Sequence, residues 1–222
     1  MTLAPDAVRA MFDRIAPVYD AMNRVMTAGL DGRWRRIAAD AVVSPGDRVL
    51  DGACGTGDFA LADLRAGAGA VTGVDFSAPM LERARRKSAE IEWVRGDLLA
   101  LPFADGSFDA ATVGFGVRNL ADLELGIREL RRVLRPGGRL AILEITQPRG
   151  PLRPFFSLWF DRLVPLFGRV LPGGAAYTYL PASVRRFPPA EELAALLERA
   201  EFSDVRFRLF AGSIVALHTG TA

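Results

Sequence analysis

A glycine-rich segment in the first quarter of the chain carries the residue types best suited to bind a small anionic ligand. Residues 47–53 (DRVLDGA) predict a strand, and residues 57–66 predict the helix that follows it. Glycines in the turn between them let a ligand approach the backbone closely, and free N–H groups at the start of the helix attract a carboxylate. Ligands of open α/β sheets bind beyond the carboxyl ends of the strands. The turn therefore predicts ligand contacts from Asp51, Gly52, Gly55, Thr56 and Gly57.

Acidic residues also follow the next two predicted strands. Asp75 ends the strand at 70–75, where a carboxylate can accept hydrogen bonds from both hydroxyl groups of a ribose. Asp97 follows the strand at 91–95 and suits the amino group of an adenine. Further residues near the same strand ends complete the predicted set: Phe76, Leu98 and Gly114. Together they predict a site for a ligand that carries a nucleoside.

The turn by itself fits two classes of cofactor-binding protein. Residues 55–60 (GTGDFA) satisfy the G-x-G-x-x-A pattern of nicotinamide and flavin enzymes. Asp51, however, lies inside the strand–turn junction, where those enzymes rarely need an acid. Taken together with residues 101–109 (LPFADGSFD) and 134–138 (LRPGG), the whole series resembles the class I S-adenosylmethionine methyltransferases. That resemblance implies S-adenosylmethionine as the cofactor.

The elements that must position these residues alternate between strand and helix patterns. Such alternation predicts a mainly parallel sheet with helices on both faces and right-handed crossovers. The predicted fold class is α/β, of the Rossmann-like class I methyltransferase type, with a seven-stranded sheet, an N-terminal helical arm and a helical insert after the fifth strand. The predicted strands are 47–53, 70–75, 91–95, 108–115, 139–145, 203–210 and 213–218.

Helix-spaced apolar residues over 4–42, punctuated by Pro17 and Gly29, predict the arm. The other predicted helices are 57–66, from an N-cap at Ser77 to about residue 88, from an N-cap at Asp122 through Arg135, and 189–200. We expect one domain over 1–222. Its expected parts are the arm (1–45), a cofactor-binding core (46–146), a substrate-side insert (147–188), and a closing helix with two strands (189–222).

The insert is the most apolar part of the chain after the core strands. Residues 151–176 are rich in Phe, Leu and Trp, have few charges, and are broken by proline and glycine. Such a segment can cover a pocket for a prenyl chain or lie in a membrane interface. It can equally pack on the core or form a homodimer contact, and the sequence leaves both interpretations open.

A narrower resemblance covers nearly the whole chain, from Met11 to Gly220. Residues 12–23 (FDRIAPVYDAMN), 113–122 (VGFGVRNLAD) and 177–188 (YTYLPASVRRFP) are similar to signatures of the ubiquinone/menaquinone C-methyltransferase family. The resemblance implies methyl transfer from S-adenosylmethionine to a ring carbon of a polyprenylated quinol. Demethylmenaquinol is the first expectation for this lipophilic substrate, and a ubiquinol precursor is the second.

Five residues are expected to act around that substrate. Arg118 is expected to stabilise the phenolate that forms when the quinol loses a hydroxyl proton, and Asn119 to hold a quinol oxygen or the cofactor. Tyr177 and Tyr179 are candidates for positioning the substrate or relaying a proton. Tyr19, in the arm, is expected to close over the cofactor.

The chain also departs from the family pattern. Gly52 stands where the family usually has an apolar residue, Thr27 replaces a usual Ser, and Asp31 replaces a common His. Thr27 keeps a hydroxyl group. Asp31 changes the charge near the expected substrate mouth.

Composition and charge argue against several other classes. The 28 basic and 26 acidic residues give a net charge of +2 and form no basic run, so we expect no nucleic-acid partner. A single His and a single Cys predict no metal site, and His218 is expected to be a structural, hydrogen-bonded histidine. The lone Cys favours a reducing compartment, and neither a signal peptide nor a membrane span is predicted. We therefore expect a cytoplasmic protein. Peripheral contact with a membrane is a second expectation.

Two alternatives remain at this stage. The chain could methylate another small aromatic acceptor, in which case the cofactor site would be kept and prenylated quinols would not react. It could also be a non-catalytic S-adenosylmethionine-binding subunit that transfers nothing by itself. Activity of the purified protein on a quinol separates both from the main hypothesis.

Overall fold

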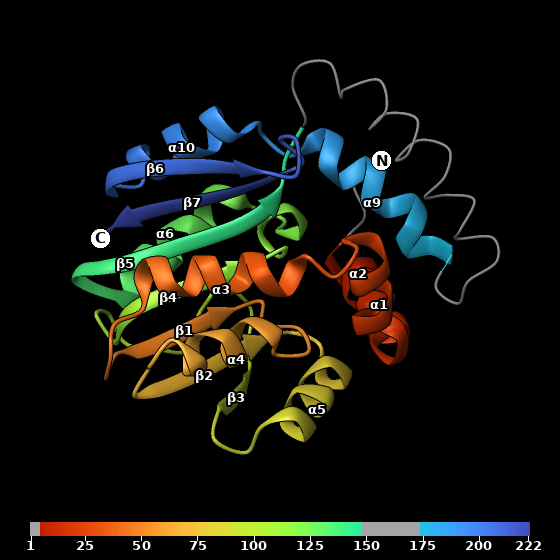
Figure 1. Ribbon diagram of the computed structural model, residues 1–222, viewed down its shortest axis with the longest axis horizontal. Helices are drawn as coiled ribbons and strands as arrows, with labels where there is room; N and C mark the ends of the chain where they lie inside the picture. The colour runs from red at the N-terminus through yellow and green to blue at the C-terminus, as the bar shows by residue number, and fades with distance from the viewer. Residues whose placement is uncertain (1–4, 148–173) are drawn as a thin grey trace.

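A seven-stranded sheet forms the centre of the molecule (Figure 1). The computed structural model describes residues 5–147 and 174–222, with side chains for 6–147 and 179–222. The strand order is β3-β2-β1-β4-β5-β7-β6, and β7 is antiparallel to both of its neighbours. The strands are β1 (Arg48–Gly52), β2 (Ala70–Asp75), β3 (Glu92–Arg95), β4 (Phe108–Gly114), β5 (Leu134–Ile145), β6 (Ser203–Phe210) and β7 (Val215–Thr221). This arrangement confirms the predicted α/β fold class with its mainly parallel, seven-stranded sheet.

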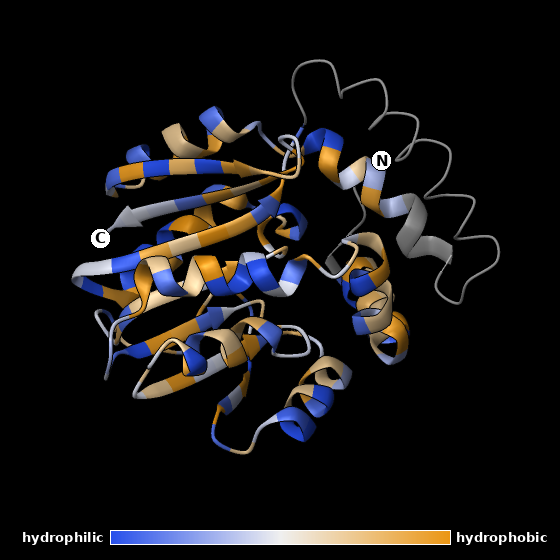
Figure 2. Ribbon diagram, in the orientation of Figure 1, coloured by the Kyte–Doolittle hydropathy of each residue, from blue (hydrophilic) through white to orange (hydrophobic). Residues whose placement is uncertain are grey.

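The middle strands are apolar because helices cover both of their faces. Val49 and Leu50 of β1 are fully buried, as expected for parallel strands enclosed on two sides. In Figure 1, α3 (Asp31–Val42) and α4 (Asp58–Arg65) lie in front of the sheet, and α6 (Leu123–Val133) and α10 (Ala190–Arg199) lie behind it. Apolar residues run along the strands, and polar residues mark the outer helix faces (Figure 2).

Two predicted N-caps are confirmed. The Ser77 hydroxyl accepts a hydrogen bond from the Met80 N–H at 3.3 Å, at the start of α5 (Ala78–Lys87). The Asp122 carboxylate accepts one from the Leu125 N–H at 2.9 Å, at the start of α6. Each cap satisfies a backbone N–H that the first turn of a helix leaves without a partner. The caps therefore fix where both helices begin, just after the carboxyl edge of the sheet.

The N-terminal arm lies across that carboxyl edge (Figure 1). It consists of α1 (Pro5–Ile15), a 3₁₀ turn η1 (Ala16–Val18) and α2 (Tyr19–Met26). The turn contains Pro17, and Gly29 (φ +74°) separates α2 from α3, so both predicted breaks are confirmed. Helix α1 contacts α5 and α9 (Gly174–Arg186). The arm therefore covers the edge at which the parallel strands end.

One prediction about the sheet is wrong. Leu134 and Arg135 were expected in the last turn of α6, and β5 was expected to begin at residue 139, but β5 begins at Leu134. Leu134 pairs with Phe108 on β4, and the Arg135 guanidinium binds the Asp109 carboxylate at 2.5 Å. A register shift between Phe108 and Ala110 accommodates the extra residues. Pairing with β4 therefore outweighs the helical pattern at these two positions.

Most of the predicted insert falls outside the described residues, since residues 148–173 are not among them. The ideas that the insert covers a prenyl pocket, touches a membrane or forms a dimer contact therefore stay predictions, as does the division of the domain. Among the helices that the structure describes, none combines the length and apolarity needed to cross a bilayer.

Candidate functional site

Two adjoining cavities open at the carboxyl edge of the sheet. The first, which we call the strand-end cavity, has a volume of about 170 Å³ and lies against the ends of β1, β2 and β4. The second, the arm cavity, has a volume of about 340 Å³ and lies between the arm, α3 and the start of η2 (Val117–Asn119). Phe12, Tyr19 and Phe115 line both. A ligand in one cavity would therefore meet a ligand in the other at these three side chains.

Asp75 is the best-organised polar group of the strand-end cavity. One carboxylate oxygen accepts a hydrogen bond from the Gly55 N–H and the other accepts one from the Ser77 N–H, both at 2.8 Å. The side chain is nearly buried, and burial raises its pKa to about 6, against the lowering effect of the two N–H donors. Each oxygen keeps a lone pair, so the carboxylate can accept two further hydrogen bonds.

Other predicted cofactor residues line the same cavity. Leu98 is buried, and the exposed Asp97 accepts a hydrogen bond from the Leu99 N–H at 2.9 Å. Gly55 has a φ of +55°, a conformation that favours glycine. The predicted residues found in the lining are Tyr19, Gly55, Asp75, Phe76, Asp97, Leu98 and Gly114. Contact of these residues with a cofactor stays a prediction.

Four predicted cofactor residues do not line the cavity. Asp51 is fully buried below α4, where it accepts a hydrogen bond from the Ala60 N–H at 2.9 Å. Burial raises its pKa well above the ordinary value, and the nearby Asp63 carboxylate raises it further. Two buried carboxylates that repel each other favour a shared proton. The Asp51 side chain therefore holds α4 against the sheet.

Gly52 and Gly57 lie close to bulky neighbours instead of the cavity. A Cβ atom on Gly52 would lie 2.6 Å from Cδ1 of Leu98, and one on Gly57 would lie 2.3 Å from Cη2 of Trp93. Gly57 also has a φ of +84°. A side chain at Gly57 would clash with the rigid Trp93 ring, whereas one at Gly52 would meet the flexible end of Leu98.

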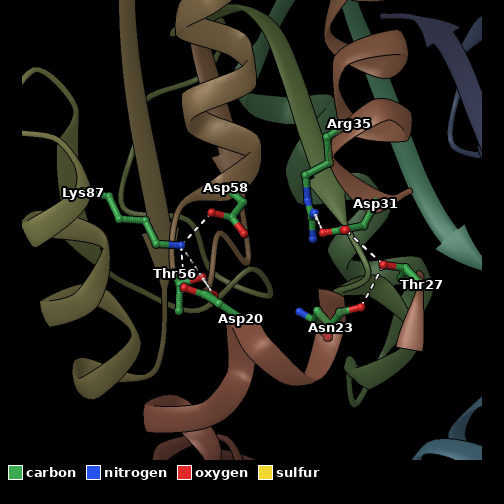
Figure 3. Close-up of polar contacts among 8 residues, drawn as sticks. All are labelled: Asp20, Asn23, Thr27, Asp31, Arg35, Thr56, Asp58 and Lys87. Carbon is green, nitrogen blue, oxygen red and sulfur yellow. Dashed lines mark hydrogen bonds and ion pairs between the residues drawn. The ribbon is translucent and has the colours of Figure 1, made fainter. Parts of the chain in front are cut away.

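Thr56 connects the turn to the arm. Its hydroxyl donates a hydrogen bond to the Asp20 carboxylate at 2.5 Å and accepts one from the Lys87 ammonium at 3.1 Å. Lys87 also forms ion pairs with Asp20 at 2.8 Å and with Asp58 at 2.6 Å (Figure 3). We call these four residues the arm latch. It joins α2, α4 and α5 beside the strand-end cavity.

Arg118 reaches the arm cavity as a member of a buried ion pair. Its Nη1 donates to Glu144 Oε1 at 2.7 Å and also to the Phe115 carbonyl. The Glu144 side chain is 1% exposed and that of Arg118 is 9% exposed. Arg118 Nε has no hydrogen-bond partner among the described residues. The Nε–H of Arg118 is thus a buried donor without a partner, which fits a ligand that carries an acceptor.

Asn119 faces the strand-end cavity instead of the arm cavity. Its Nδ2 donates weakly to the Phe115 carbonyl at 3.4 Å, and its buried Oδ1 has no partner among the described residues. An acceptor that is buried and unpaired fits a ligand that carries N–H groups. Of its two predicted roles, this position favours contact with the cofactor.

The two predicted tyrosines differ in what the structure describes. Tyr179 lines the arm cavity, and burial raises its pKa above the ordinary value, so its hydroxyl is neutral at pH 7. The side chain of Tyr177 lies outside the described residues. His218 is buried on β7, where Nε2 lies 2.8 Å from the Ala190 carbonyl oxygen, and it lines neither cavity. The interpretation of His218 as a structural histidine is confirmed.

Apolar side chains make up most of the arm cavity, and one polar cluster stands out within it. Met11, Ile15 and Trp34 are buried members of its lining. Asp31 forms an ion pair with Arg35, and its other carboxylate oxygen accepts a hydrogen bond from the Thr27 hydroxyl at 3.0 Å (Figure 3). Thr27, Asp31 and Arg35 all line the cavity.

Several of these residues were not assigned a site role from the sequence. Glu144 is the one charged residue in the run AILEI (141–145), so a charge at the end of an apolar strand could have marked it. Lys87 is the single lysine of the chain. Phe115 has a φ of +59°, which is rare for a bulky residue, and no sequence signal reveals such backbone strain.

Comparison with known proteins gives a consistent result. The pattern of the ubiE/COQ5 methyltransferase family matches residues 1–222. A demethylmenaquinone methyltransferase of Thermus thermophilus is 46% identical over 95% of this chain and 99% of its own length. A 2-phytyl-1,4-naphtoquinone methyltransferase of Synechococcus elongatus is 43% identical over 95% of each chain.

Among solved structures, the likeness extends to the fold. A SAM-dependent methyltransferase of Thermotoga maritima superimposes with a TM-score of 0.64 and 21% identity, over 96% of this chain and 98% of its own. The [4+2]-cyclase SpnF superimposes with a TM-score of 0.66 and 21% identity, over 86% of this chain and 80% of its own. Because SpnF is named a cyclase, the fold alone does not identify the reaction.

Proposed function

The chain belongs to the ubiE/COQ5 methyltransferase family, and from this premise we propose that it methylates a ring carbon of a polyprenylated quinol, with S-adenosylmethionine as the methyl donor. We propose demethylmenaquinol as the substrate, which makes the reaction a step of menaquinone biosynthesis. The observation that carries this proposal is the pair of adjoining cavities, one with ribose-type acceptors and one apolar with a guanidinium donor. The relatives named for naphthoquinone methylation support the choice of acceptor.

The hydrogen-bond acceptors of the strand-end cavity suit S-adenosylmethionine. The Asp75 carboxylate suits the ribose hydroxyls, and Asp97 with Leu98 suits the adenine. The unpaired Oδ1 of Asn119 suits an N–H group of the ligand. When bound, S-adenosylmethionine supplies the methyl group on a sulfonium, which is a good leaving group.

The arm cavity supplies the other half of the reaction. The acceptor carbon of a quinol becomes nucleophilic when a ring hydroxyl gives its proton to a water molecule, and the Arg118 guanidinium would stabilise the resulting phenolate. The bond from the ring carbon to the methyl group forms as the bond from the methyl group to sulfur breaks. Loss of the ring proton to solvent then restores aromaticity. Phe12, Tyr19 and Phe115 line both cavities and would orient the ring toward the methyl donor.

A direct assay tests the proposal. Purified protein is incubated with S-adenosylmethionine and chemically reduced demethylmenaquinone, and the lipid is analysed by mass spectrometry. We expect a product heavier by one methylene unit from the reduced substrate and none from the oxidised quinone, whose ring is electron-poor.

A ubiquinol precursor serves as the second substrate in the same assay. Product from that precursor alone would contradict the choice of headgroup. No product from either substrate, although S-adenosylmethionine binds, would contradict quinol methylation and favour another aromatic acceptor.

The arm latch gives a further prediction. Replacing Lys87 with Met should weaken S-adenosylmethionine binding about tenfold at low salt, which corresponds to roughly 1.4 kcal/mol. The physical reason is that Lys87 joins Asp20 of the arm to Asp58 of α4, and without it Tyr19 is no longer held over the cavity. Isothermal titration calorimetry at 20 mM and 500 mM salt measures the effect, which screening should reduce at high salt.

Two variants control this experiment. Lys87→Arg keeps the charge and should bind nearly as the wild type does. Arg86→Met removes a charge one residue earlier on α5 and should leave binding unchanged. Equal affinity of wild type and Lys87→Met at low salt would show that the latch does not contribute to cofactor binding.

A further inference from the structure

The arm cavity holds a carboxylate that the proposed reaction does not yet use. Asp31 is the first residue of α3, and its side chain is 13% exposed among apolar residues of the cavity wall. Burying a carboxylate is costly unless it is paired and hydrogen-bonded. Arg35, one turn later on α3, provides the pairing through Nη1 and Asp31 Oδ2. The remaining oxygen, Oδ1, is the one that accepts from Thr27.

That remaining oxygen can accept another hydrogen bond. The Thr27 hydroxyl lies 2.8 Å from the Asn23 carbonyl oxygen and 3.0 Å from Asp31 Oδ1, but it has one hydrogen to donate (Figure 3). Whenever that hydrogen points to Asn23, Asp31 Oδ1 has no donor from Thr27. Asn23, Thr27 and Asp31 all line the cavity, so a ligand hydroxyl there would meet a charged acceptor.

The charge of Asp31 is maintained by its neighbours. Burial opposes ionisation, but the charge of Arg35 and the hydrogen bonds from Arg35 and Thr27 outweigh it, so the pKa of Asp31 lies below its ordinary value. At neutral pH the group therefore accepts hydrogen bonds and cannot donate one.

Phe115 contacts both arginines that pair with the carboxylates near the arm cavity. The guanidinium of Arg35, the partner of Asp31, lies 5.4 Å from the centre of the Phe115 ring. Arg118 donates to the Phe115 carbonyl from the other arginine–carboxylate pair of the cavity. Phe115 itself lies on the wall shared with the strand-end cavity. The arm cavity thus has two polar groups, a guanidinium that donates hydrogen bonds and a carboxylate that accepts them.

A 1,4-quinol also has two polar points, and they differ in role during methylation. One hydroxyl becomes the phenolate, which suits Arg118. The second keeps its proton and can donate it. We propose, building on the proposed function, that Asp31 Oδ1 accepts a hydrogen bond from this second hydroxyl and thereby selects the reduced quinol over the oxidised quinone. A quinone carbonyl has no hydrogen to donate and would face the carboxylate with its own lone pairs.

A binding experiment tests the proposal independently of turnover. The probe is 2-prenyl-1,4-naphthoquinone with a single isoprene unit, titrated anaerobically by calorimetry as quinone and, after dithionite reduction, as quinol. We expect wild-type protein to bind the quinol at least tenfold more tightly than the quinone. In Asp31→Asn this ratio should fall to threefold or less, because the amide can donate to a quinone carbonyl.

Turnover gives a second readout. The hydrogen bond to the second hydroxyl is present both before and during methyl transfer, so its loss should raise KM about tenfold while kcat changes less than threefold. Asp31→Glu, which retains a carboxylate, should restore the preference for the quinol in part.

Two variants separate this role from a structural one. Thr27→Val removes the competing hydroxyl and keeps the carboxylate, so the quinol preference should persist. Asp47→Asn is the matched control. Asp47 is an aspartate of similar burial that pairs with Arg139 at 2.5 Å, and neither residue lines a cavity. This substitution should leave the quinol preference and KM unchanged. Thermal unfolding and S-adenosylmethionine affinity confirm that each variant is folded.

The outcomes are distinct. An unchanged quinol preference in folded Asp31→Asn, or its loss in Thr27→Val, overturns the role of Asp31 and leaves the proposed function intact. If Asp31→Asn does not fold, Asp31→Glu decides, and a quinol preference equal to that of the wild type would overturn the role of Asp31. If the wild type neither binds nor methylates the quinol, the proposed function fails and this inference fails with it.

Discussion

Asp75→Ala is expected to weaken S-adenosylmethionine binding about 100-fold, or roughly 2.7 kcal/mol. Two hydrogen bonds from ribose hydroxyls to a carboxylate would be lost, and hydrogen bonds to charged groups contribute about 1.5–3 kcal/mol each. The Gly55 and Ser77 N–H groups would also lose their acceptor, which loosens the turn. Calorimetric titration measures the change.

Asp75→Asn separates charge from geometry. The amide oxygen can still accept from one of the two backbone N–H groups, but the NH2 group replaces the acceptor of the other, so thermal unfolding is measured beside affinity. We expect a loss of about tenfold or more in affinity, corresponding to ~1.4 kcal/mol. Asp109→Asn is the matched control, because Asp109 accepts from the Arg48 N–H and pairs with Arg135 without lining either cavity. Affinity within threefold of wild type in both Asp75 variants would remove Asp75 from the cofactor site.

The same residue predicts a pH dependence. Burial raises the pKa of Asp75 to about 6, so the free protein holds a proton there at pH 5 and not at pH 7. Two hydroxyl donors favour the ionised form, so S-adenosylmethionine should bind fully above pH 6 and more weakly as the pH falls through that value. Asp75→Asn, which does not titrate, should lack this step.

Arg118 is expected to have the largest effect on turnover. Removing one donor to a developing anion typically lowers kcat by about 10²–10³-fold, and we expect Arg118→Ala to fall in this range. S-adenosylmethionine affinity should stay within threefold of wild type, since Arg118 does not line the strand-end cavity. Single-turnover assays with demethylmenaquinol measure the loss.

The Arg118→Ala variant is also expected to be less stable than the wild type, which would affect its measured turnover. Without Arg118, Glu144 would remain as a buried and unpaired charge, which typically costs about 3–5 kcal/mol. The double variant Arg118→Met, Glu144→Gln replaces the ion pair with neutral groups of similar size and should fold. Its kcat should remain as low as that of Arg118→Ala. Near wild-type turnover in the folded double variant would exclude phenolate stabilisation by Arg118.

The sequence predicted which edge of the sheet holds the candidate cofactor residues because of a simple property of parallel sheets. Their carboxyl ends meet at one edge, so Asp75 and Asp97 could be assigned from the ends of their strands alone. Within the turn the same reasoning was less accurate. Successive strand residues point to opposite faces, and the face assigned to Asp51 and Gly52 depends on which helix packs there. Asp51 turned out to support α4, and Gly52 turned out to accommodate Leu98.

The acceptor side of the site depended on the tertiary structure. Arg118 and Glu144 are 26 residues apart, and Asp20 and Thr56 are 36 apart, so no local pattern predicts that they pair. The family resemblance indicated Arg118 and Asn119, but packing directed one side chain to each cavity. The sequence alone predicted the α/β fold and acids at two strand ends, because these depend on periodicity and short spacing, and the family was predicted from its resemblance to known signatures. The arm latch and the Arg118–Glu144 pair came from tertiary structure, because the arm and the strand ends bring together residues that are far apart in the sequence. Asp31 and Arg35 pair locally on α3, and tertiary structure decided only that they line the arm cavity.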